Sequence, residues 1–101
     1  MLAHDGTLKS KVEPRVTPEE VKRLYSLMIL VRTLDARMMI LQRQGRIGTF
    51  APIKGQEAAQ VASVAALRRT DWMVPSFRET ASMLWRGWPM EKLLLFFSGH
   101  L

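Results

Sequence analysis

Residues 17–45 read TPEEVKRLYSLMILVRTLDARMMILQRQG and predict one long helix. Its start is marked by Thr17 as a hydroxyl N-cap, by Pro18 at the first helical position and by Glu20 three residues after the cap. After Pro18, no glycine or proline interrupts the segment until Gly45. Glycine readily adopts the left-handed conformation found at helix ends, so both limits of this helix are predicted from local sequence.

Apolar side chains lie on two faces of this predicted helix. One face carries residues at alternating steps of three and four, which is the spacing of a packed seam: Leu24, Leu27, Val31, Leu34, Met38 and Leu41. A second stripe lies roughly opposite: Tyr25, Ile29, Ala36 and Ile40. We expect the rest of a larger polypeptide or another subunit to cover the second stripe. The alternative is that this is the central helix of a small bundle.

The rest of the chain predicts three shorter helices and one brief strand. A glycine-rich connector over residues 45–55 precedes an alanine-rich helix over residues 56–69, in which Arg68 and Arg69 suit the C-terminal dipole. The further elements are a strand over residues 72–74, a helix capped by Ser76 and closed by Gly87, and a helix from Pro89 to Gly99. Residues 1–16 lack periodicity and predict a flexible arm, followed by a helical region over residues 17–101 that is expected to be an incomplete part of a larger domain.

Composition excludes several classes of protein. The 101 residues permit one small domain, and the absence of cysteine excludes disulfides and thiolate metal sites. His4 and His100 lie at opposite ends of the sequence, so a histidine-based metal site is not expected. The longest apolar runs are far shorter than the roughly 18 residues that a membrane span needs. With no secretory signal indicated, we expect a cytoplasmic protein without a membrane partner.

The net charge of +6 raises the question of nucleic-acid binding. No run of three basic residues occurs, and basic side chains alternate with acidic ones along the chain. This spread favours a solvated or subunit-facing surface, so no nucleic-acid partner is expected.

Two positions are candidates for chemistry. If Ser76 caps a helix, Phe77 and Arg78 occupy its first turn, where free N–H groups and a guanidinium would together suit an anion. The alternative is that Arg78 pairs with Glu79 or another surface carboxylate. Glu57 is either a buried acid or, as we favour, a dipole partner in the first turn of its helix.

Residues 24–101 resemble the N-terminal region of the alpha subunit of thiamine-diphosphate-dependent 2-oxo acid dehydrogenases. The resemblance is carried by the runs Leu30–Arg37 (LVRTLDAR), Gln42–Gly48 (QRQGRIG), Gly55–Ala58 (GQEA), Asp71-Trp72 and Pro75–Glu79 (PSFRE). Ala51-Pro52 and the ending Phe97–His100 look closer to bacterial pyruvate dehydrogenases than to the branched-chain enzymes. The fold implied is the N-terminal, mainly helical portion of an α/β thiamine-diphosphate-binding fold.

The resemblance also implies site residues and cofactors. Phe77 and Arg78 stand where the family has a Tyr-Arg pair that touches the cofactor diphosphate, so both are expected to bind thiamine diphosphate. Phe50 and Ala51 are expected to border the substrate channel. The Mg2+ ligands are expected outside this chain. Many relatives have histidines at the positions that match Ala51 and Thr80. This chain has neither histidine, so no catalytic residue is assigned here.

The function implied is oxidative decarboxylation of a 2-oxo acid, pyruvate being the first choice, with transfer of the acyl group to a lipoyl arm. The partners implied are a beta subunit, a second alpha subunit and a lipoyl-bearing acyltransferase, and the chain alone is expected to be inactive. Two alternatives are a branched-chain 2-oxo acid dehydrogenase alpha subunit and a helical interaction module without a cofactor.

Overall fold

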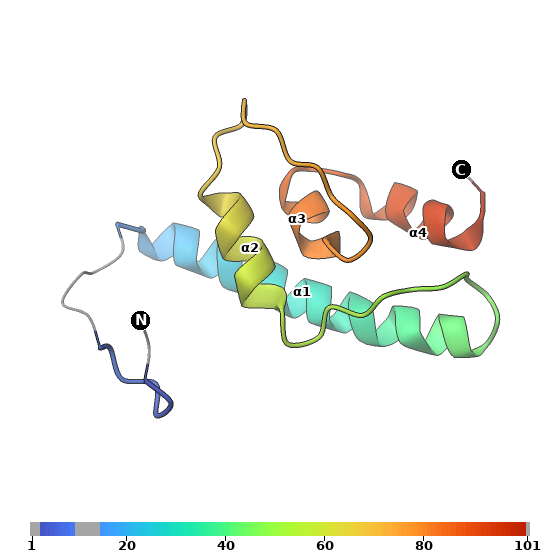
Figure 1. The fold of residues 1–101 in the computed structure, drawn as a ribbon, viewed down its shortest axis with the longest axis horizontal. Coiled ribbons are helices and arrows are strands. Elements are labelled where there is room, and N and C mark those ends of the chain that lie inside the picture. The colour runs from blue at the N-terminus through green and yellow to red at the C-terminus, as the bar shows by residue number, and fades with distance from the viewer. Residues whose placement is uncertain (1–2, 10–14, 101) are drawn as a thin grey trace.

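A computed structural model describes residues 3–9 and 15–100 of the chain. In this part there are four helices: α1 (Pro18–Arg43), α2 (Glu57–Ala65), α3 (Thr80–Trp85) and α4 (Met90–Ser98). Figure 1 shows α1 running the length of the molecule, with α2 crossing it and α4 lying above its C-terminal half. A helix of 26 residues is about 39 Å long, so α1 accounts for most of the longest dimension, 48 Å.

The ends of α1 confirm the prediction made from local sequence. The backbone N–H of Glu20 donates to the Thr17 hydroxyl at 3.2 Å, and the Thr17 N–H donates to the Glu20 carboxylate at 2.7 Å. This reciprocal capping box satisfies two N–H groups that the helix leaves without partners. At the other end Gly45 has a φ of +69°, and its N–H donates to the carbonyl of Gln42.

The predicted apolar seam of α1 is the packed face. Its central residues Val31, Leu34 and Met38 are buried, and the outer three of the six are partly buried against the same core. The opposite stripe is exposed in this chain, with exposed fractions of 63% for Tyr25 and 50% for Ile29.

Two apolar clusters along the seam make up the core. The first joins α1 to the connector, α2 and α3 through Val31, Ile53, Val61 and Ala81. The second joins α1 to the connector and α4 through Leu34, Met38, Phe50 and Leu93. The connector between α1 and α2 therefore contributes one buried side chain to each cluster.

The second helix is shorter than predicted. It ends at Ala65, so Arg68 and Arg69 lie in the following turn and not in the last turn of the helix. The Arg86 guanidinium donates to the carbonyls of Arg68, Arg69 and Asp71 at 2.9–3.0 Å. The carbonyls of this turn thereby find a partner from a distant part of the chain.

The prediction that Ser76 caps the third helix is wrong. The helix begins at Thr80, and Glu79 occupies the N-cap position without a side-chain cap bond. The Glu79 carboxylate accepts the N–H groups of Ser76 and Arg78, so one bond of the expected Ser76–Glu79 capping box is present without the helix that it was expected to start. Phe77 and Arg78 therefore lie before the helix and not in its first turn.

The predicted strand at residues 72–74 is also wrong. This segment has no strand assignment, and no strand runs beside it in the described part of the chain. Trp72 and Val74 are 92% and 89% exposed. A strand needs a neighbouring strand for its backbone hydrogen bonds, and none is present beside residues 72–74 in the described part of the chain. The described fold is mainly helical.

The predicted arm over residues 1–16 includes residues 1–2 and 10–14, which lie outside the described residues. Residues 3–9 contain a turn in which the Asp5 carboxylate accepts the backbone N–H and the hydroxyl of Thr7. Among the described helices, none combines the length and apolarity needed to cross a bilayer.

Candidate functional site

The connector between α1 and α2 is held in place by hydrogen bonds to α1 and to α4. The Phe50 N–H donates to the side-chain oxygen of Gln42 at 3.0 Å, and the Gly48 N–H donates to the Phe97 carbonyl at 2.8 Å. Pairing of these two N–H groups with fixed partners restricts the conformations that this non-helical segment can adopt. The segment carrying Phe50 and Ala51 is thus ordered by contacts within this chain.

Asp35 is the most buried of the groups that hold the connector. Its side chain is 3% exposed, and Oδ1 accepts the Ile53 N–H at 2.7 Å. A carboxylate that accepts a backbone N–H in the interior satisfies both groups at once. Asp35 therefore fixes Ile53, which lies two residues after Ala51, against the middle of α1.

Glu57, the first residue of α2, forms an ion pair with Arg32 of α1. Arg32 Nε and Nη2 donate to the two carboxylate oxygens at 2.8 and 2.9 Å, and the Gly55 N–H donates to Oε2 at 2.9 Å. These hydrogen bonds, led by those from Arg32, outweigh burial and lower the pKa of Glu57 to about 2. Glu57 lies in the first turn of α2, as the favoured expectation held, and it is also buried, as the alternative held. It is ionised and joins α2 to α1.

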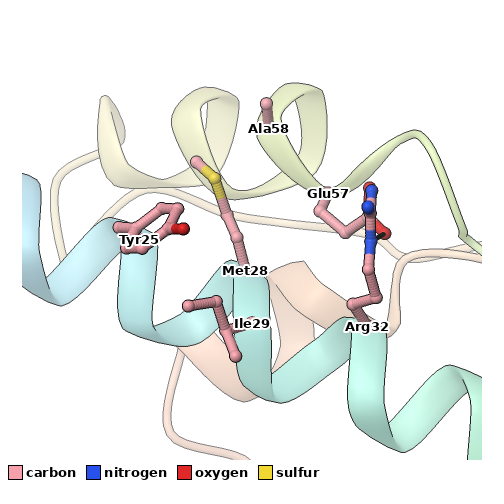
Figure 2. A pocket seen from close by; sticks show the side chains of 6 residues that line it. All are labelled: Tyr25, Met28, Ile29, Arg32, Glu57 and Ala58. Atoms are coloured by element: carbon pink, nitrogen blue, oxygen red, sulfur yellow. Dashed lines mark hydrogen bonds and ion pairs between the residues drawn. The ribbon is translucent and has the colours of Figure 1, made fainter.

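Figure 2 shows this pair at one end of a hollow between α1 and α2, where Arg32 rises from α1 toward Glu57. The hollow has a volume of about 230 Å³, and its other walls are the side chains of Tyr25, Met28, Ile29 and Ala58. The exposed stripe of α1 thus continues into an apolar hollow that ends at a charged pair.

The segment that carries Phe77 and Arg78 is ordered by Gln60 of α2. The Gln60 amide donates to the Arg78 carbonyl at 2.8 Å and accepts the Ala81 N–H at 3.2 Å. Together with the Glu79 carboxylate, it satisfies the backbone on both sides of Arg78. The position of the Arg78 backbone is therefore set by tertiary contacts.

The Arg78 guanidinium lies 5.6 Å from the centre of the Phe77 ring. Over residues 3–9 and 15–100 the one ion pair is that of Arg32 with Glu57, so Arg78 pairs with no carboxylate there. The alternative in which Glu79 neutralises Arg78 is wrong, since Glu79 binds backbone N–H groups. Arg78 thus presents an uncompensated charge beside an exposed ring, which suits an anionic group.

Phe97 connects the two candidate segments. Its ring packs edge-on against Phe50 with centroids 5.1 Å apart, and it lines a cavity of about 170 Å³ that Phe77 also lines. Phe50 is buried in the core, whereas Ala51 is half-buried. In the structure Phe50 therefore anchors its segment, and Ala51 is the more accessible of the two predicted channel residues.

For a metal ion, the described residues offer no group of three or more His, Asp or Glu side chains. The Arg78 guanidinium has no carboxylate partner among the described residues and has the donors that an anion such as a diphosphate requires, while the neighbouring Glu79 carboxylate is engaged by backbone N–H groups.

Residues 25–101 match the family described as dehydrogenase E1 component, and the chain belongs to this family. It is 40% identical over 87 residues to the pyruvate dehydrogenase E1 component subunit alpha of Bacillus subtilis, covering 86% of this chain and 24% of that protein. The protein of the same name from Staphylococcus aureus (strain Mu50) is 41% identical with the same coverage. The Staphylococcus epidermidis protein of this name is 39% identical over 101 residues, covering 99% of this chain and 27% of that protein. The chain spans about a quarter of the length of these curated relatives.

Sequence reasoning missed the side chains that organise the site. Asp35, Gln42 and Gln60 were not singled out, and Arg32 was not paired with Glu57. One signal was present for Asp35, because a carboxylate directly beside the seam residue Leu34 is unusual in a buried helix face. The partners themselves lie 8–25 residues away along the chain, where local patterns do not reach.

Proposed function

We propose that this chain forms the N-terminal portion of the alpha subunit of a thiamine-diphosphate-dependent 2-oxo acid dehydrogenase acting on pyruvate. Membership of the dehydrogenase E1 component family supports the class, and the names of the similar proteins support pyruvate as the substrate. The proposed reaction is oxidative decarboxylation followed by transfer of the acyl group to a lipoyl arm. The proposed assembly contains a beta subunit and a second alpha subunit.

The observation that carries the proposal is the guanidinium of Arg78, which has no carboxylate partner within residues 3–9 and 15–100, on a backbone ordered by Gln60 and Glu79. Its role is to bind the cofactor diphosphate through charge-assisted hydrogen bonds. When bound, thiamine diphosphate supplies the nucleophilic carbon and the electron sink on which 2-oxo acids lose CO2. Mg2+, held by residues elsewhere in the subunit, is proposed to share the diphosphate charge.

The Phe77 ring has a second proposed role beside the diphosphate. It is 69% exposed, so it offers an apolar surface to a bound cofactor, but it lacks the hydroxyl of the tyrosine that the family resemblance places there. Ala51 is proposed to border the substrate channel, with Phe50 holding it from the core. Asp35 and Gln42 act as positioning residues for this segment through Ile53 and Phe50.

Thiamine diphosphate affinity of the complete alpha subunit, assembled with its beta subunit, tests the cofactor role. Arg78→Ala removes a charged hydrogen-bond donor and is expected to weaken affinity about 10- to 100-fold, with Arg78→Lys intermediate. Phe77→Tyr is expected to strengthen it about 2- to 10-fold by adding a hydroxyl. Arg37→Ala, an exposed α1 arginine, is the matched control. Equal affinity in Arg78→Ala and the control would refute the assignment.

Substrate choice has a separate test. Initial rates of decarboxylation by the assembled enzyme are measured with pyruvate and with a branched-chain 2-oxo acid. A higher kcat/KM for pyruvate is expected, and a preference for the branched-chain acid would replace the proposed substrate with the alternative one.

A further inference from the structure

A second pocket, separate from the segments around Ala51 and Arg78, lies where α1, the turn after α2 and the end of α3 meet. Its volume is about 290 Å³. The residues that line it are Arg23, Leu67, Arg69, Trp85 and Arg86. Three of the five are arginines and none is acidic, so the lining is strongly cationic.

The Arg86 side chain, which lines this pocket, is held by the backbone of the turn after α2. Its Nη1 and Nη2 groups make three hydrogen bonds, to the carbonyls of Arg68, Arg69 and Asp71. A guanidinium has five N–H donors, so two remain for a ligand. Because the side chain is already ordered, binding through these donors costs little conformational entropy.

Arg23 is also held in place, from the α1 side. Its Cζ lies 4.6 Å above the centre of the Trp85 ring, a cation–π arrangement. In this arrangement the guanidinium edge stays free to donate hydrogen bonds while its face contacts the indole. Arg69 is exposed and completes the cationic lining.

These charges have no acidic partner in residues 3–9 and 15–100. The nearby Asp71 carboxylate accepts the Arg68 N–H at 2.8 Å, and the one ion pair of this region is that of Arg32 with Glu57. Like charges converging without a counter-charge repel one another, and an anion removes this cost.

An apolar hollow of about 250 Å³ adjoins the pocket and shares Arg23 and Trp85 with it. Its other walls include Leu27, Leu30 and Leu84. The two hollows together present a cationic end and an apolar end on either side of the stacked Arg23–Trp85 pair.

We propose that this pocket binds the phosphate or carboxylate group of a small organic anion whose apolar part lies in the adjoining hollow. Bidentate donation from guanidinium groups suits either oxyanion. The volume of the cationic end is that of a small-molecule site and is too small to receive a helix of a partner protein. The proposal does not depend on the cofactor role of Arg78.

Trp85 fluorescence in the complete protein provides the test. Titrations use inorganic phosphate, acetate, hexyl phosphate and hexanoate, with sodium chloride holding ionic strength constant. Saturable changes are expected, with hexyl phosphate binding about tenfold or more tightly than inorganic phosphate, because its chain is buried. Hexanoate is likewise expected to bind more tightly than acetate, and the comparison of hexanoate with hexyl phosphate shows which oxyanion is preferred. Trp85→Phe should abolish the signal.

Arg23→Gln and Arg69→Gln are each expected to weaken hexyl phosphate binding about tenfold or more. Arg37→Gln, on the same helix as Arg23 but outside the pocket, should leave it unchanged. The Arg78→Gln variant should also retain binding, which separates this site from the proposed cofactor site. Arg86 is left intact because it holds the turn after α2.

Two results would overturn the proposal. One is a fluorescence change with the organic anions that is no larger than the change with chloride at equal ionic strength. A pocket filled by an acidic side chain of another polypeptide would give this result. The other is equal loss of binding in the Arg37→Gln control, which would mark the effect as one of general charge.

Discussion

The ion pair between Arg32 and Glu57 is unequal, because its two members differ in exposure. The Arg32 side chain is 58% exposed and the Glu57 side chain is 5% exposed. Removing Arg32 leaves a buried carboxylate with the Gly55 N–H as its remaining described partner. Removing the Glu57 charge leaves a guanidinium that water can solvate. The two substitutions are therefore expected to differ in cost.

The magnitudes follow from this geometry. Arg32→Met is expected to lower the free energy of unfolding by more than Glu57→Gln does, because it leaves a buried carboxylate without its guanidinium partner. Glu57→Gln keeps an acceptor for Gly55 and loses two charge-assisted bonds to a solvated partner, so about 1–3 kcal/mol is expected. The double variant should cost less than the sum of the two, since the orphaned charge is gone.

The pH dependence gives a second signature of the same pair. The pKa of Glu57 is about 2 in the folded protein and 4.5 ordinarily, so between these values the unfolded chain binds the additional proton. The stabilising contribution is complete above about pH 4.5 and is lost as pH falls toward 2. In the Arg32→Met variant, protonation of Glu57 removes a buried charge that has no guanidinium partner. The loss in free energy of unfolding caused by this substitution should therefore become smaller as pH falls below neutral.

Urea unfolding of the complete protein, followed by far-UV circular dichroism, measures these differences at several pH values. Arg37→Met removes an exposed arginine of the same helix and is the matched control. If Glu57→Gln cost more than Arg32→Met at neutral pH, or if the cost of Arg32→Met did not change with pH, the reasoning from burial would be refuted.

Three further outcomes are expected. Thr17→Ala should lower the free energy of unfolding by about 1 kcal/mol in urea titrations, because the capping box at the start of α1 loses its hydroxyl acceptor; no change would mean that the box does not hold in solution. Gly45→Ala should cost about 1–2 kcal/mol in the same measurement, since φ is +69° there, and an increase in stability would contradict that conformation. Asp35→Ala should speed amide exchange at Ile53, with Asp35→Asn showing a smaller effect because it keeps an oxygen acceptor; equal exchange in both variants and the parent would argue against the buried bond.

The length and register of α1 were predictable because their causes are local. The capping box spans residues 17–20, and the apolar seam repeats every three or four residues, so each contact that defines the helix is encoded within a few positions. The same holds for Gly99, whose left-handed conformation ends α4 as predicted. The second apolar stripe is likewise predicted by residue spacing, and the structure adds that it is exposed in this chain.

The limits of α2 and α3 could not be predicted, because they depend on distant side chains. Arg86 binds the carbonyls after α2, and Gln60 binds the backbone before α3, each across 15 or more residues. The local pattern at Ser76 forms its backbone bond to the Glu79 carboxylate, but the helix begins only at Thr80. The candidate site was predicted in part: Phe77 and Arg78 were named, but the reason for Arg78 being unpaired is the engagement of Glu79 with backbone N–H groups.

Periodicity and caps act over one or two helical turns, so local sequence alone predicts the long two-faced helix that organises this chain. Packing of the helices brings Arg32 to Glu57, Asp35 to the connector and three arginines to the pocket beside Trp85. Charge pairing and buried hydrogen bonding depend on distances in space, which no local pattern encodes. Those distances exist only after the apolar seam of α1 has packed against the shorter helices.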